Sequence, residues 1–82
     1  MEELVRQIVE PMISNKAALM IKTVAAPDEK EPMEVIVIAD KTDIARLIGK
    51  GGSVANAIRK VISIKSRLDD VHVKVKFESY DD

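Results

Sequence analysis

Three glycines and one lysine occupy four consecutive positions in the middle of the chain, Gly49-Lys50-Gly51-Gly52. A ligand approaches main-chain N–H groups closely only where no side chain stands in front of them, and glycine leaves that space empty. A helix that begins after this turn adds its unpaired N–H groups and the positive end of its dipole. Lys50 adds a mobile positive charge suited to a phosphate oxygen. The turn therefore predicts an anion site, with phosphate as the candidate ligand.

Apolar residues at helical spacing on both sides of this turn predict two helices that it joins. Gly49 is expected to end the first helix, because glycine enters the left-handed region without steric cost, and Gly52 with Ser53 to open the second. Asp40 is expected to cap the first helix, with Asp43 strengthening its start. The apolar positions are Ile44, Leu47 and Ile48 in the first helix and, predicted as the buried face of a second helix over 53–65, Val54, Ala57, Ile58, Val61 and Ile62.

The other segments predict one more helix and three strands. The helix near the start is expected to kink or to stop early near Val9 or Glu10, because Pro11 removes a hydrogen bond and crowds the carbonyl four residues back. The strand over 18–25 has apolar residues on both faces, which leaves its buried side open. The expected ranges are a helix over 2–13, strands over 18–25, 34–39 (central) and 71–77 (Val71, Val73, Val75 and Phe77 inward), an exposed loop over 27–32 and a tail loose over 79–82.

The segment Leu-Ile-Gly-Lys-Gly-Gly, followed by Ile58 six residues after the last glycine, resembles the GxxG signature of the KH domain, a nucleic-acid-binding module. The order of elements resembles the type II KH arrangement. The chain as a whole is similar to the small bacterial single-KH RNA-binding proteins of the KhpA family, which are partners of the larger Jag/KhpB proteins. We therefore expect one KH domain over residues 1–82.

The expected fold is α+β, in the order α-β-β-α-α-β, with three helices covering one face of a three-stranded sheet. The resemblance implies a mixed sheet, with the first two strands antiparallel and the last parallel to the central one. The helix pair supplies the long crossover that parallel pairing needs.

The resemblance also implies a groove for about four unpaired nucleotides, with phosphates held by the GxxG main chain and bases against an aliphatic wall. The aliphatic positions fit an ordinary core equally well, and His72 fits an exposed strand residue better than a ligand contact. The implied RNA-binding residues are Gly49, Lys50, Gly51, Gly52 and Ser53 at the turn, Ile44, Leu47, Ile48, Val54 and Ala55 as the wall, His72 and Val73 opposite, and Arg46 and Arg59 at the rim.

The net charge of −1 alone argues against a nucleic-acid ligand, because Lys and Arg supply the sequence-independent attraction to phosphate. The distribution of charge favours one. Residues 41–67 hold seven Lys and Arg against Asp43 alone, or 7 − 1 = +6, and the remainder carries 6 − 13 = −7. The alternative is that helices often carry solvated basic side chains. The chain has only Phe77 and Tyr80 as aromatics, which predicts weak RNA binding.

Several function classes have no support in the sequence. Cysteine is absent and His72 is the single histidine, so neither a metal site nor a bound cofactor is expected. No nucleophile stands with a base and an orienting carboxylate, and no Walker sequence occurs, so neither an enzyme nor a small-molecule substrate is expected. The apolar runs are shorter than the roughly 20 residues that span a bilayer, and the first residues do not form a signal peptide, so a cytoplasmic protein is expected.

Two functions remain. The first is a module that clamps short single-stranded RNA with low sequence specificity. The second is a protein-interaction adapter that binds through its hairpin or outer sheet face, with RNA binding secondary. The resemblance implies a homodimer, a Jag/KhpB partner, RNA chaperone or post-transcriptional activity, and a role in cell elongation, cell shape and wall synthesis. The RNA targets, the oligomeric state and the partner surface stay open.

Overall fold

The computed structural model describes residues 2–28 and 30–80, and over these ranges the helices and strands follow the expected order. The elements follow the α-β-β-α-α-β order of the type II KH fold, which confirms the expected fold class. The helices are α1 (Glu2–Val9), α2 (Lys41–Ile48) and α3 (Ser53–Leu68); the strands are β1 (Met20–Val24), β2 (Met33–Ala39) and β3 (Val73–Ser79); three 3-10 turns are η1 (Glu10–Met12), η2 (Lys16–Ala18) and η3 (Lys50–Gly52).

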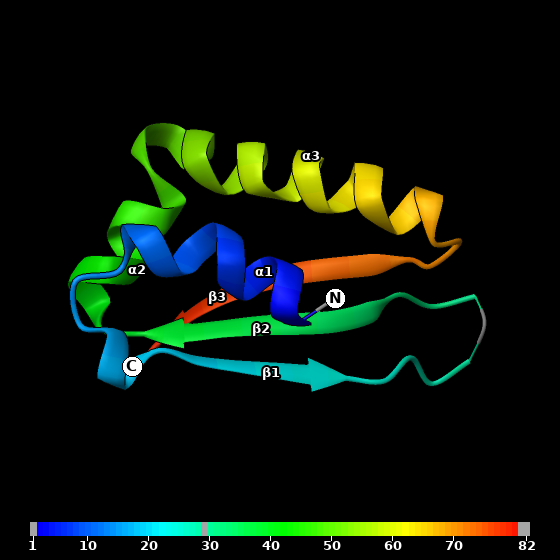
Figure 1. Ribbon diagram of the computed structural model, residues 1–82, viewed down its shortest axis with the longest axis horizontal. Helices are drawn as coiled ribbons and strands as arrows, with labels where there is room; N and C mark the ends of the chain where they lie inside the picture. The colour runs from blue at the N-terminus through cyan, green and yellow to red at the C-terminus, as the bar shows by residue number, and fades with distance from the viewer. Residues whose placement is uncertain (1, 29, 81–82) are drawn as a thin grey trace.

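The three strands form one mixed sheet in the order β1-β2-β3 (Figure 1). β1 pairs with β2 antiparallel, which places Ile21 opposite Val37. β2 pairs with β3 in parallel, which places Val35 opposite Val75. The unbroken apolar run of β2 thus lies at the centre of the sheet, as predicted, and β3 is an edge strand beside α3.

The helices cover one face of the sheet. α1 packs against β1 and α3, and α2 packs against β2, β3 and α3. Burial of apolar side chains between these layers is the main favourable contribution to folding. The core comprises Val5, Val9, Ile13, Ile21, Val35, Val37, Ala39, Ile44, Leu47, Ile58, Ile62 and Val75.

α1 ends at Val9, where the sequence predicted an early stop. Pro11 lies in the first positions of η1, where its missing N–H leaves no hydrogen bond unmade. The chain thus tightens into a 3-10 turn and then becomes extended at Ile13, which is buried. Proline therefore separates the helix from the link that leads to β1.

The buried face of α3 differs from the predicted one. Ala57 and Val61 are exposed and Val54 is half-buried. Apolar residues occur all around this helix, so the sequence allowed two apolar faces, and packing against α1 and β3 selects one of them. The helix also continues to Leu68 rather than ending at 65. The residues buried on α3 are Ala55, Ile58, Ile62 and Ser66.

The strands at the edges also differ from their predicted ranges. β3 begins at Val73, and Val71, expected to face inward, is 39% exposed before the strand starts. β1 is shorter than predicted, and Ile21 is its buried residue. The tail is ordered further than expected, because the Tyr80 hydroxyl donates a 2.7 Å hydrogen bond to the carbonyl oxygen of Ala18. The expectation for residues 81–82 lies outside the described residues.

The loop between β1 and β2 is exposed at Pro27, Asp28 and 30–32, as expected, and residue 29 lies outside the described ranges. Asp28 accepts hydrogen bonds from the N–H groups of Lys30 (2.7 Å) and Glu31 (3.2 Å), which folds the loop into a turn. Over residues 2–28 and 30–80, no helix is both long and apolar enough to cross a membrane.

Candidate nucleic-acid interface

The glycine turn has the backbone conformation that its sequence predicts. Gly49 ends α2 at φ 74° and ψ 175°, and its N–H donates a 3.0 Å hydrogen bond to the carbonyl oxygen of Ala45. Gly51 (φ 62°) and Gly52 (φ 81°) also lie in the left-handed region, after which α3 begins at Ser53. Residues other than glycine rarely adopt these conformations, so glycine is favoured at all three positions.

The three glycines differ in how much space surrounds them. A Cβ atom on Gly49 would lie 2.5 Å from Cγ2 of Val54, so the start of α3 packs directly against that main chain. A Cβ on Gly52 would come no closer than 3.9 Å to Nδ2 of Asn56, and one on Gly51 would meet nothing within 4 Å. Gly49 therefore allows two helices to pack closely, and Gly51 leaves main chain open to a ligand.

The open main chain lies beside two further sources of positive potential. Lys50 is exposed and takes part in none of the ion pairs between described residues. α3 follows directly, has no acidic residue in its first turn, and presents its unpaired N–H groups there. Ser53 is exposed at the same place. This arrangement suits an anion that approaches the turn from solvent.

The predicted aliphatic wall divides between core and surface. Ile44, Leu47 and Ala55 are buried, so a base would not reach them without a change in packing. Ile48 is 39% exposed, and Val54 is half-buried. Ile48 and Val54 are thus the members of the wall that a base beside the turn could contact.

Arg46, predicted at the rim of the groove, lies in the last turn of α2, but its side chain reaches back toward the first turn of the helix. Its Nη1 donates to Oγ of Ser14 (2.6 Å) and lies 3.3 Å from Oδ1 of Asp43. Asp43 accepts hydrogen bonds from the N–H groups of Ser14 (3.0 Å) and Asn15 (3.1 Å) and is only 2% exposed. Arg46 therefore helps to fasten the segment before β1 onto α2.

The predicted capping of α2 is wrong in its detail. Asp40 does occupy the N-cap position, but its side chain makes no capping hydrogen bond and instead accepts one from Nδ2 of Asn15 at 2.7 Å. Asp43 points at the main chain of the segment before β1 rather than at its own helix. The N–H groups of Ser14 and Asn15 lower the pKa of Asp43, with a smaller contribution from Arg46, and together they outweigh the opposing effect of burial.

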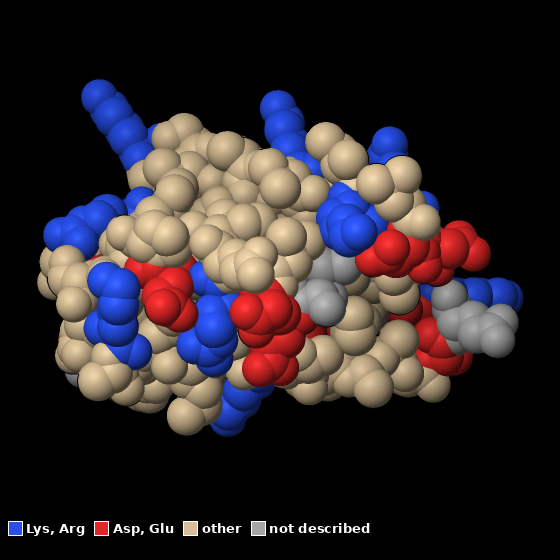
Figure 2. Space-filling view, in the orientation of Figure 1, with Lys and Arg blue, Asp and Glu red and all other residues tan. Residues whose placement is uncertain are grey.

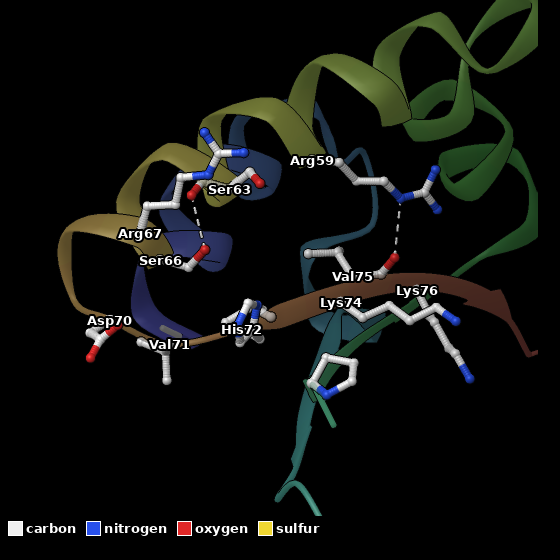
Figure 3. Close-up of a pocket in the computed structure, with 12 residues that line it drawn as sticks. Arg59, Ser63, Ser66, Arg67, Asp70, Val71, His72, Lys74, Val75 and Lys76 are labelled. Carbon is white, nitrogen blue, oxygen red and sulfur yellow. Dashed lines mark hydrogen bonds between the residues drawn. The ribbon is translucent and has the colours of Figure 1, made fainter. Parts of the chain in front are cut away.

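A groove of about 600 Å³ lies between α3, from Arg59 onward, and the first half of β3 (Figure 3). Basic side chains from both elements line it, and Asp70 lies at its end. Of the residues that line the groove, sequence reasoning named Arg59, His72 and Val73 as site residues but missed the others. The spacing of residues 59, 63 and 67 and the alternation of lysines in β3 were the available signals. Besides Asp70, the polar and basic lining residues are Arg59, Ser63, Ser66, Arg67, His72, Lys74 and Lys76.

Arg59 reaches from α3 across to β3. Its Nε donates a 3.3 Å hydrogen bond to the carbonyl oxygen of Val75, and its guanidinium carbon lies 5.5 Å from the centre of the Phe77 ring. Figure 3 shows this bridge between helix and strand. His72 is exposed just before β3, and its carbonyl oxygen accepts a 2.9 Å hydrogen bond from the N–H of Met33.

Basic side chains project from one edge of the molecule, and others lie among acidic side chains on the face in view (Figure 2). Figure 2 shows Lys and Arg projecting from the edge where α3 lies in Figure 1, whereas most of the visible Asp and Glu atoms lie below it or at the far end. The separation of +6 and −7 along the sequence is thus partly preserved in space. An anionic polymer would be steered toward the α3 edge.

Comparison with known proteins identifies the family. A family model described as the KhpA/KhpB KH domain matches residues 2–77, from α1 through most of β3. Two similar relatives, both named RNA-binding protein KhpA, come from Streptococcus pneumoniae serotype 4 and serotype 2. Each is 38% identical over 61 residues, which cover 74% of this chain and 73% of the relative. The chain therefore belongs to the KhpA/KhpB family of KH domains.

Proposed function

We propose that this protein binds short single-stranded RNA, with phosphates held at the glycine turn and bases directed along α3. KH domains of this family are RNA-binding proteins that are not known as enzymes, and the relatives are named for RNA binding. The observation that carries the proposal is the open main chain at Gly51, beside Lys50 and the first turn of α3. For the same reason we propose that the protein acts in the cytoplasm.

The groove between α3 and β3 also supports the proposal that RNA lies along α3. It begins at Arg59, within two turns of the start of α3, and continues past Arg67. A strand that leaves the glycine turn along α3 therefore meets basic side chains from Arg59 onward. Ile48 and Val54 supply an apolar contact beside the turn, which suits the face of a base.

The test is a variant with Lys50→Asp and Gly51→Asp. It puts two carboxylates where phosphate is proposed to lie, and aspartate is among the residues that best tolerate the left-handed conformation at Gly51. We expect the affinity for a uridine octamer, measured by fluorescence anisotropy, to fall by at least about 100-fold, since phosphate contacts dominate such binding.

A matched control changes the net charge equally at a distance from the turn. Lys50→Asp with Gly51→Asp changes it by −2 − 1 = −3, and Lys22→Asp with Gln7→Glu also changes it by −2 − 1 = −3. Both control positions are exposed, on β1 and α1. The control should retain most of the affinity. Equal losses in the two variants, with both folded by circular dichroism, would show a general charge effect and refute the clamp.

A second candidate function rests on the outer face of α3. Val61, Ile64 and Leu68 are 50%, 64% and 76% exposed and follow one another at helical spacing. Large apolar side chains grouped on a helix surface are typical of protein interfaces. We propose that this face binds a second copy of the chain or a Jag/KhpB-type partner.

Replacing Ile64 by Glu separates the two functions. We expect a dimer seen by sedimentation velocity to become a monomer, or capture of a Jag/KhpB-type protein to be lost, while the uridine octamer still binds. Lys60→Gln, on the same helix beside this face, also changes the net charge by −1 and serves as the control for charge. If neither self-association nor partner capture changes, the proposed protein interface is wrong.

The proposed role in the cell follows from family membership. An RNA clamp that also pairs with a Jag/KhpB-type protein would act as an RNA chaperone or post-transcriptional regulator in cell elongation, cell shape and wall synthesis. A strain carrying Lys50→Asp with Gly51→Asp should then show the same change in cell length as a deletion strain. Normal cell length in that strain, but not in the deletion strain, would separate this role from RNA binding.

A further inference from the structure

Arg59 is the basic residue of the groove whose guanidinium is held by two contacts. Its Nε donates to the carbonyl oxygen of Val75, and its cation lies over the ring of Phe77. These contacts restrain both the position and the plane of the group. The remaining N–H groups, on Nη1 and Nη2, make no hydrogen bond or ion pair within residues 2–28 and 30–80.

The free side of this guanidinium faces the path proposed for RNA. Figure 3 shows its terminal nitrogens directed away from Ser63, toward the first turns of α3. The glycine turn lies in that direction, immediately before Ser53. A nucleotide adjoining the phosphates at the turn would therefore bring its base toward a fixed pair of donors.

A fixed pair of parallel N–H donors distinguishes bases by their acceptors. Guanine offers O6 and N7 side by side, and cytosine offers O2 and N3. Adenine and uracil have no two acceptors side by side on one edge. The two parallel N–H donors of the guanidinium, its fork, therefore make at most one good hydrogen bond with them. In single-stranded RNA these edges are free of pairing and can be read directly.

We propose that Arg59 is the specificity-determining residue of the RNA site and selects a base with two adjacent acceptors, guanine or cytosine, at one position of the bound strand. The inference rests on the proposed RNA clamp. Arg59 acts by hydrogen bonds to the base edge, and Phe77 is the positioning residue that keeps the guanidinium in place. Holding the fork before binding removes part of the entropy cost of ordering a long side chain.

The experiment uses the full chain and a set of RNA octamers. Octauridine measures binding without the selected base, and a single guanine, cytosine or adenine is then moved along it, one position at a time. For the unmodified protein we expect guanine or cytosine at one position to strengthen binding about tenfold, and adenine to have little effect. The guanine and cytosine sets show which base the fork accepts.

Arg59→Lys keeps the charge but loses the fork. We expect the preference for guanine or cytosine to disappear while the affinity for octauridine stays within about threefold, because the phosphate contacts are retained. Arg67→Lys, the same substitution eight residues further along α3 in the same groove, should leave the preference unchanged. An equal loss for every octamer in Arg59→Lys would make Arg59 a phosphate contact and overturn the proposal.

Two substitutions of Phe77 test the positioning. Phe77→Leu removes the ring under the guanidinium and should reduce the base preference several-fold with Arg59 intact, whereas Phe77→Tyr keeps the ring and should keep the preference. Thermal melting establishes that both variants fold. If the unmodified protein binds octauridine but shows no base preference, this inference fails and the clamp stands; if no octamer binds, both fail.

Discussion

The two ends of α2 are constructed differently. At its start, Asp43 accepts hydrogen bonds from the N–H groups of Ser14 and Asn15, and Arg46 reaches back from the last turn to donate to Oγ of Ser14, at distances of 2.6–3.1 Å. At its end, the chain passes into a turn in which Lys50 is the only residue with a side chain. The start of the helix is therefore fixed by side chains and its end by backbone conformation. Side chains packed around the turn would cover the main chain that a ligand has to reach. The side-chain hydrogen bonds that hold α2 in place therefore lie away from the turn.

The largest effect is expected at Gly49, where the backbone conformation fixes the end of α2. Gly49→Ala should lower the free energy of unfolding by about 3 kcal/mol, because alanine is strained at φ 74° and ψ 175° and its Cβ would overlap Val54. Gly51→Ala should cost only about 1 kcal/mol, since its space is open and only the backbone conformation is unfavourable. Urea unfolding monitored by circular dichroism measures both. Equal losses would mean that the two glycines have the same structural role.

The contribution of side-chain hydrogen bonds at the start of α2 is tested at Asp43. The pKa of Asp43 is lowered in the folded protein, so the unfolded chain binds the proton more tightly. Its contribution to stability is therefore full above its ordinary pKa of about 3.9 and is lost as the pH falls through the lowered folded value. Asp43→Asn should be less stable near neutral pH and should lose less stability on acidification.

Thermal melting between neutral pH and about pH 2 checks this dependence. Glu31→Gln, which removes one exposed carboxylate from the β1–β2 loop, controls for the change in net charge. If Asp43→Asn and Glu31→Gln melt with the same pH dependence, the tie at the start of α2 does not stabilise the fold through its carboxylate.

The smallest effect is expected at Lys50. A single-stranded ligand that neutralises three basic groups gives a slope of about −2 in a plot of log affinity against log salt concentration. Lys50→Gln should reduce the magnitude of this slope by about 0.7, one phosphate contact, while leaving stability unchanged because Lys50 is exposed. Anisotropy titrations at three salt concentrations measure it. An unchanged slope would place the phosphate away from the turn.

The glycine turn and the stop of α1 were both predictable because each depends on local chemistry. Gly49 and Pro11 restrict the backbone of their own residues, whatever the rest of the chain does. The buried face of α3 was not predictable in the same way. Val61 and Ile62 are adjacent and almost equally apolar, yet one is 50% exposed and the other 1%. Only the positions of α1 and β3 distinguish them.

The side-chain roles around the site show the same division. Asp43 looked like a residue of a helix start, and its actual partners, Ser14 and Asn15, lie 29 and 28 residues earlier in the chain. Arg59 looked like one of several rim cations, and its restraint depends on Val75 and Phe77 in a strand that follows later. Long-range contacts of this kind leave no periodic pattern in the sequence.

By itself, the sequence determined the order of helices and strands, the central position of β2 and the bare glycine turn, because apolar periodicity and the conformational limits of glycine and proline act over a few residues. The tertiary structure alone decided which side of α3 is buried, that Gly49 is packed and Gly51 open, and that a basic groove lies between α3 and β3. These features depend on the separation and orientation of elements distant in the chain, which no local pattern specifies.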